Sequence, residues 1–152
     1  MQTQWLNAAE QQMWHGYLDS TRLLLRTLDR QLTAESGINL TDFEILVLLS
    51  EAPGRRMRMN ELADGTLTTR SGVTRAVKRL VEAGWVQQAR CEDDKRGQYA
   101  ELTEAGMDKL RTAAPGHVNV VRANIFDLLS PRDVELFGHA YGRIRDNLLG
   151  KS

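Results

Sequence analysis

The chain has 152 residues, 41% of them hydrophobic, and its 20 basic residues balance its 20 acidic ones. No segment approaches the roughly 18 consecutive apolar residues of a membrane-spanning helix, and a single cysteine, Cys91, excludes an internal disulfide framework. Residues 1–10 lack the basic region and small-residue cleavage site of a signal peptide. We therefore expect one cytoplasmic domain over residues 1–152, with no membrane partner.

The balanced net charge hides a local excess of basic residues. Residues 55–90 contain eight arginines and lysines against three acidic residues, so the remainder of the chain is acidic. One basic face on a chain whose total charge is zero can attract polyanions such as nucleic acid. A solvated surface of mixed charge is the alternative for this segment taken alone.

A long amphipathic helix is expected near the N-terminus, ended by Gly37. Its apolar stripe follows helical spacing and consists of Trp14, Leu18, Leu25, Leu28 and Leu32. A second, short helix is expected to begin at Thr41, because Thr41 and Glu44 have the spacing of a capping box. The Pro53-Gly54 pair should end this helix.

The next segment has the pattern of a helix-turn-helix. After a basic connection over residues 55–58, a short helix is expected over residues 60–63. A longer helix is expected from about Arg70 to Ala83, capped by Thr68 or Thr69. Its apolar side should consist of Val73, Ala76, Val77, Leu80 and Val81. Two short helices joined by a tight turn, the second of them basic, are typical of a helix-turn-helix.

A hairpin and a further helix should follow. Turn residues from Glu92 to Gly97 separate two candidate strands, residues 85–91 and 98–102. Thr103 is the expected cap of the next helix, which the Pro115-Gly116 pair should kink or interrupt.

The last helix is expected to begin at Ser130-Pro131, with serine at the cap and proline at the first helical position. Its apolar residues step by three and four along the chain, and they are Val134, Phe137, Tyr141, Ile144 and Leu148. This spacing is a heptad seam, which favours a partner helix.

Enzyme motifs are not found in the sequence. The chain has no glycine-rich phosphate loop, nucleophile elbow or zinc-protease motif. The three histidines, His15, His117 and His139, lack the spacing of metal ligands, so neither a metal nor another cofactor is expected. Cys91 follows Arg90 but precedes acidic residues that oppose thiolate formation, so a half-buried thiol is favoured over a redox centre. We therefore expect a protein that is not an enzyme.

The order of helix-turn-helix, basic second helix and hairpin indicates DNA binding. A helix whose apolar side packs on the protein body can lay its polar side in the major groove. Small residues near its start allow close approach, and basic residues reach guanine edges or phosphates. The expected contacts are Arg70, Ser71, Gly72, Thr74, Arg75, Lys78 and Arg79 on the helix, with Lys95 and Arg96 at the hairpin tip. An amphipathic surface helix without DNA contact is the alternative.

Five stretches of this segment match the pattern of a known family. They are Ser71-Gly72-Val73-Thr74-Arg75, Arg79-Leu80, Ala83-Gly84-Trp85-Val86, Asp94-Lys95-Arg96-Gly97 and Leu102-Thr103-Glu104-Ala105-Gly106. The first three resemble the recognition helix and its exit in the MarR family of bacterial transcriptional regulators. The last two resemble the wing signature of that family at its proper spacing.

The resemblance implies a mainly α-helical fold with a small β wing, a winged helix-turn-helix with N- and C-terminal dimerisation helices. Within this single MarR-like domain, residues 40–102 would form the DNA-binding lobe, and residues 1–36 and 103–152 the dimerisation helices. The partners implied are a second copy of the chain and a pseudo-palindromic operator in double-stranded DNA.

The resemblance also implies roles for individual wing residues. Arg96 would enter the minor groove and Asp94 would hold it there. The sequence departs from the family at Gln87 and Gln88, where relatives often carry basic residues, so this strand should contribute less to backbone affinity.

Family members commonly bind small aromatic or phenolic effectors between the DNA-binding lobe and the dimerisation helices, and then lose affinity for DNA. The residues expected to bind such an effector are Trp14, His15, Tyr17, Arg22 and His117. Core packing of the aromatic pair is the alternative. The function predicted is that of a sequence-specific transcriptional regulator, a repressor more often than an activator. A ligand- or protein-binding dimer of the same fold without DNA binding is the other hypothesis.

Overall fold

The computed structural model describes residues 2–92 and 97–151 of the chain. The chain divides into two compact units, residues 1–117 and residues 118–152. The helices are α1 (Ala8–Ser36), α2 (Leu40–Glu51), α3 (Met59–Asp64), α4 (Arg70–Glu82), α5 (Glu104–Asn124) and α6 (Pro131–Leu148), with short 3-10 turns η1 (Pro53–Arg55) and η2 (Phe126–Leu128). The strands are β1 (Arg56–Arg58), β2 (Val86–Arg90) and β3 (Gln98–Leu102). This composition confirms the expected fold class, mainly α-helical with a small β wing.

Helix α1 ends where the sequence predicts, at Gly37, whose φ of 68° is the left-handed conformation that favours glycine. The expected start of α2 at Thr41 is wrong. The helix begins at Leu40 and is capped by Asn39, whose side chain accepts a hydrogen bond from the Asp42 amide at 2.8 Å. Asparagine is a strong N-cap, and it precedes the threonine in the chain, so the helix starts earlier.

Helices α3 and α4 form the expected helix-turn-helix, and both pack with α2 around one core. Thr69 caps α4, since its hydroxyl accepts from the Gly72 amide at 3.1 Å. Residues of this core with almost no exposed surface include Ile45, Leu46, Leu49, Leu62, Val73, Ala76, Val77 and Leu80. Val81 was expected on the same side but is exposed, because it lies at the margin of the apolar stripe.

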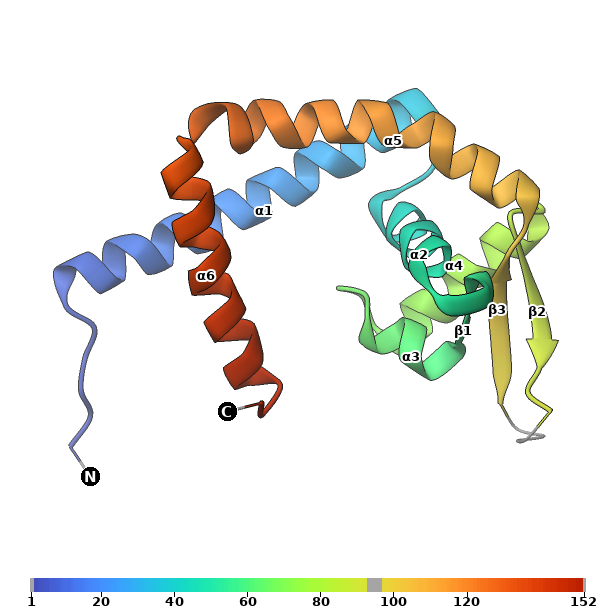
Figure 1. Cartoon of the computed structure of the whole chain (residues 1–152), viewed down its shortest axis with the longest axis horizontal. Helices are drawn as coiled ribbons and strands as arrows, with labels where there is room; N and C mark the ends of the chain where they lie inside the picture. The colour runs from blue at the N-terminus through green and yellow to red at the C-terminus, as the bar shows by residue number, and fades with distance from the viewer. Residues whose placement is uncertain (1, 93–96, 152) are drawn as a thin grey trace. The chain divides into compact units, whose positions relative to one another are not determined.

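The hairpin is confirmed as β2 and β3, which pair antiparallel beside α4 (Figure 1). The segment expected as a connection contains a third strand, β1, so that the sheet order is β1-β3-β2. In this register Met57 lies opposite Ala100 and packs against the core, while Arg58 lies opposite Tyr99 on the other face. Residues in β1 are too few to show an alternating pattern, so the sequence alone did not reveal the strand.

Helix α5 runs through Pro115 without the expected break. A proline inside a helix costs about 3 kcal/mol, yet helix α5 continues to Asn124. Gly116 lies so close to α1 that a Cβ atom there would come within 2.6 Å of Gln31 Nε2. Leu110 and Ala113 of the same helix are buried.

Helix α6 starts at the predicted cap. Ser130 and Asp133 form a reciprocal capping box, and Pro131 occupies the first helical position. The preceding helix, α5, ends at Asn124 and is followed by η2. Over the described part of the chain, none of the helices is both long and apolar enough to cross a bilayer.

Candidate nucleic-acid interface

The polar side of α4 forms the centre of the candidate interface. Its buried side packs on α2, α3 and β2, which leaves the opposite side free for a ligand. The exposed residues of this side are Arg70, Ser71, Thr74, Arg75 and Lys78. No acidic residue precedes Glu82 in this helix, so the face combines three positive charges with two short hydroxyl side chains.

Gly72 was expected to allow close approach to DNA, and its Cβ position is also close to two threonines that precede α4. A Cβ atom at this position would lie 2.3 Å from Thr68 Oγ1 and 3.2 Å from Thr69 Oγ1. The glycine is therefore required for the tight turn that leads into α4. The predicted close approach of Gly72 to DNA stays a prediction.

Arg79 differs from the other basic residues of α4 because it has a partner within the protein. Its Nη2 donates to Asp42 Oδ1 at 2.8 Å, and Asp42 is 7% exposed. Among the residues that the structure describes, Arg75 and Lys78 form no ion pair. This difference could not be predicted from the sequence, because Arg79 and Asp42 lie 37 positions apart.

The turn between α3 and α4 is held by a second acidic residue of α2. The backbone of Leu67 forms a hydrogen bond to the Glu44 carboxylate. Burial raises the pKa of Glu44 above its ordinary value, and this hydrogen bond opposes part of the rise. Glu44 of α2 thus contacts the turn that precedes α4. Asp42, also on α2, contacts the end of α4.

The wing is described up to Glu92 and again from Gly97. The expected contacts Asp94, Lys95 and Arg96 lie outside the described residues. On the described strands, Gln87 donates to Glu101 at 2.9 Å and Gln88 donates to Gln98 at 3.1 Å. The two glutamines therefore form side-chain hydrogen bonds between β2 and β3.

Strand β1 adds basic residues that were not among the predicted contacts. The guanidinium carbons of Arg56 and Arg58 lie 4.4 and 5.6 Å from the centre of the Tyr99 ring, in cation–π geometry. Arg56 also forms an ion pair with Glu101 at 3.6 Å. The basic composition of residues 55–58 is the signal that could have indicated a charged surface here.

The five residues expected to bind an effector do not form one cluster in the chain. Trp14 and Tyr17 stack with their ring centres 5.8 Å apart and are exposed, as are His15 and Arg22. Arg22 forms an ion pair with Asp19 at 2.9 Å. His117 follows Gly116, which contacts Gln31, and a helix rises about 25 Å over the 17 residues from Trp14 to Gln31.

His117 packs at the junction of α5 and α2. Its ring centre lies 4.3 Å from that of Phe43. His117 Nδ1 and Gln31 Oε1 are buried without a hydrogen-bond partner. Burial lowers the pKa of His117, so the neutral imidazole is favoured here.

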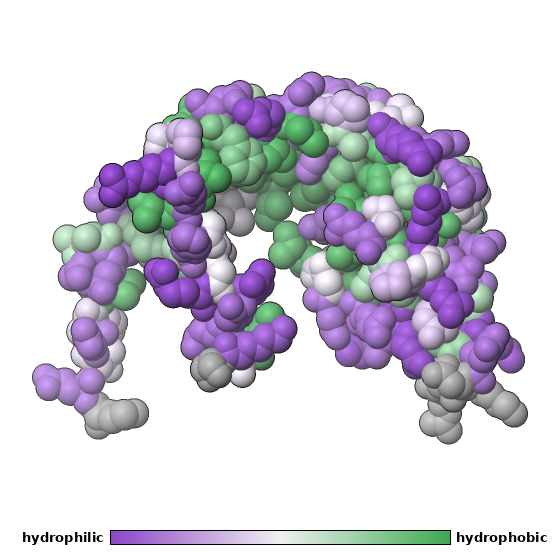
Figure 2. All heavy atoms as spheres, viewed as in Figure 1, coloured by the Kyte–Doolittle hydropathy of each residue, from purple (hydrophilic) through white to green (hydrophobic). Residues whose placement is uncertain are grey.

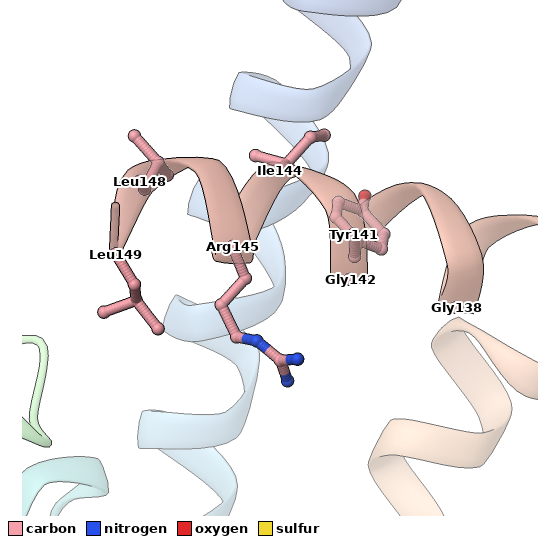
Figure 3. Close-up of a pocket in the computed structure, with 7 residues that line it drawn as sticks. All are labelled: Gly138, Tyr141, Gly142, Ile144, Arg145, Leu148 and Leu149. Atoms are coloured by element: carbon pink, nitrogen blue, oxygen red, sulfur yellow. The ribbon is translucent and has the colours of Figure 1, made fainter. Parts of the chain in front are cut away.

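Helix α6 presents an apolar surface that nothing in its own unit covers. The five residues of the expected seam are 37 to 78% exposed, and hydrophobic side chains are visible at the surface of this helix (Figure 2). A shallow groove runs beside the seam, where two glycines leave the helix backbone open (Figure 3). It is lined by Gly138, Tyr141, Gly142, Ile144, Arg145, Leu148 and Leu149.

Comparison with known proteins identifies relatives of this arrangement. The model of the MarR family matches residues 36–97. The transcriptional repressor YetL of Bacillus subtilis is 29% identical over 115 residues, which cover 76% of this chain and 68% of that protein.

Two solved structures from Streptomyces coelicolor match almost the whole chain. One is Sco3205, a MarR family transcriptional regulator in complex with DNA, with 42% identity, a TM-score of 0.88, and coverage of 96% of this chain and 92% of that one. The other is AbsC, also a MarR family transcriptional regulator, with 40% identity, a TM-score of 0.87, and coverage of 97% and 99%.

Proposed function

Because the chain belongs to the MarR family of transcriptional regulators, we propose that it binds a specific double-stranded DNA operator as a homodimer and represses transcription there. The observation that supports this most strongly is the exposed face of α4, which is basic and free of ion pairs at Arg75 and Lys78. The similar chain Sco3205 was solved in complex with DNA. A cytoplasmic location goes with this role.

The proposed contacts of α4 divide between base edges and phosphates. Ser71, Thr74 and Arg75 lie in the first half of the helix, the part that enters the major groove in helix-turn-helix proteins. An arginine in that position can form two hydrogen bonds to a guanine. Arg70 at the helix start and Lys78 farther along supply charge to flanking phosphates.

In the wing, the proposed contacts are Lys95 and Arg96, with Asp94 orienting the arginine. An arginine at a hairpin tip suits the narrow minor groove, where the negative potential is strongest. Residues 40–102 form the proposed DNA-binding lobe.

Dimerisation through the terminal helices, residues 1–36 and 103–152, is supported by exposed apolar surface. In addition to the α6 seam, the N-terminal segment exposes apolar side chains. They are Trp5, Leu6, Met13, Trp14 and Leu18. Exposed apolar patches of this extent are typical of interfaces between chains. A two-fold dimer would present two copies of α4 and so require a pseudo-palindromic operator.

A small aromatic or phenolic effector that releases the dimer from DNA is part of the proposal. The exposed Trp14 and Tyr17 rings, with His15 and Arg22 beside them, offer stacking surface and polar groups for an aromatic anion. His117 contributes an unpartnered ring nitrogen at a separate position.

Selection from a pool of random duplexes tests the proposed function. The wild-type chain should enrich duplexes with two related half-sites, about one helical turn apart, and bind them far more tightly than random DNA. A dimer of the same fold that enriches no sequence and binds all duplexes weakly would support the alternative without DNA binding.

A further inference from the structure

The ion pair between Asp42 and Arg79 joins the first turn of α2 to the last turn of α4. We propose that Asp42 is a positioning residue for DNA binding: it engages Arg79, fixes α4 on α2, and keeps this arginine from serving as a DNA contact. The inference rests on the proposed function and gives Arg79 a different role from the other basic residues of α4.

The burial of Asp42 makes its partner necessary. Asp42 is the one buried charged or polar residue in the part of the chain that the structure describes. A carboxylate removed from water is costly unless it is paired and hydrogen bonded. The guanidinium of Arg79 supplies a charged donor at 2.8 Å while half of its side chain remains exposed.

The ends of the two helices reinforce the pair. Asp42 lies in the first turn of α2, where backbone amides favour a negative charge. Arg79 lies in the last turn of α4, where backbone carbonyls favour a positive charge. Each charge therefore matches the end of the helix on which it lies, as well as the charge of its partner.

Asp42 is itself held from the side of α1. Its backbone amide donates to Asn39 Oδ1 at 2.8 Å, and the Leu40 amide donates to Asp29 Oδ1 on α1 at 2.9 Å. These bonds fix the first turn of α2 relative to α1. The ion pair then extends this fixed arrangement to α4, so that the recognition face has a defined orientation.

Salt titrations separate a positioning role from a phosphate contact. The variants are Arg79→Gln, Asp42→Asn, the double variant, and Lys78→Gln as the matched control, because Lys78 is the proposed phosphate contact on the exposed side of α4. Each is titrated with salt on a duplex selected by the wild-type chain and on a random duplex. Circular dichroism confirms that each variant is folded at the temperature used. If a single variant unfolds, the double variant is used in its place, because its two amide side chains can still form a neutral hydrogen bond.

A positioning role predicts that Arg79→Gln retains the wild-type salt slope but loses preference for the selected duplex, on the order of tenfold, as one mismatched base pair would cause. Asp42→Asn should lose the same preference, although removing a negative charge would by itself strengthen binding to any duplex. The double variant should be no worse than the worse single one. Lys78→Gln should lower the slope and leave the preference for the selected duplex intact.

The proposal is overturned if Arg79→Gln lowers the salt slope as much as Lys78→Gln with the preference intact, because Arg79 would then be a phosphate contact. It is also overturned if Arg79→Gln changes neither quantity. A wild-type chain that enriches no duplex contradicts the proposed function and, with it, this inference.

Discussion

Among single residues, Glu44 has a structural role that lowers the stability of the fold when its carboxylate is ionised. Its carboxylate accepts from the backbone of Leu67 in the turn before α4, yet burial raises its pKa. The ionised form is therefore less stable in the folded chain than in the unfolded one. The stability that protonated Glu44 contributes is complete below its ordinary pKa of 4.5 and is lost as the pH rises through the raised value.

Glu44→Gln should consequently stabilise the protein more at about pH 7 than at about pH 4. Glutamine retains an oxygen that can accept from Leu67 but has no charge to bury. Thermal unfolding of both proteins across this pH range, at equal concentration, measures the difference. A gain in Tm that is the same at all pH values would show that ionisation of Glu44 is not the cause.

Residue roles were only partly predictable from the sequence. The exposed positions of Arg70, Ser71, Thr74, Arg75 and Lys78 follow from helical periodicity, which is a local property. The partner of Arg79 lies in another helix, and the glycine at position 72 faces a threonine that precedes the helix. Contacts of this kind depend on how elements pack, and a single sequence does not contain that information.

At the scale of elements, local signals placed most boundaries correctly. Caps at Thr69 and Ser130 and the left-handed glycine at Gly37 act within a few residues, so they can be recognised in a sequence. Strand β1 could not be recognised, because it is defined by pairing with a strand more than forty residues later. Pro115 does not interrupt α5, because a proline inside a helix lowers its stability without always ending it.

The cap of α4 should have a measurable effect on stability. Thr69→Ala removes the hydroxyl that accepts from the Gly72 amide, so we expect a loss of about 1 kcal/mol in the free energy of unfolding. Thr74→Ala is the matched control, since its hydroxyl donates to the Arg70 carbonyl inside the helix and caps nothing. Urea unfolding at one protein concentration compares them. Equal losses for both variants would argue against the cap.

At the scale of the whole molecule, exposed apolar side chains on α6 indicate an assembly larger than one chain. Phe137 and Tyr141 stack on each other with ring centres 6.2 Å apart, yet both are about half exposed. Burial of a large apolar side chain contributes about 1.5–3 kcal/mol. Several such residues on each chain are enough to favour a stable dimer.

Ile144→Glu should therefore shift the protein from dimer to monomer, because it places a charge in the α6 seam. His139→Glu adds the same charge on the opposite side of the helix and should leave the dimer intact. Sedimentation velocity over a range of concentrations distinguishes the two outcomes. A dimer that survives Ile144→Glu would exclude the seam from the interface.

The central claim, that α4 reads DNA, is tested most directly by the affinity of Arg75→Ala for the selected operator. Arg111→Ala is the control, because Arg111 is also an exposed arginine, lies on α5 and pairs with Asp108. We predict that Arg75→Ala loses about 1–3 kcal/mol of operator binding and relaxes the preference at one position of each half-site, while Arg111→Ala binds as the wild type does. Unchanged affinity and preference in Arg75→Ala would contradict the account.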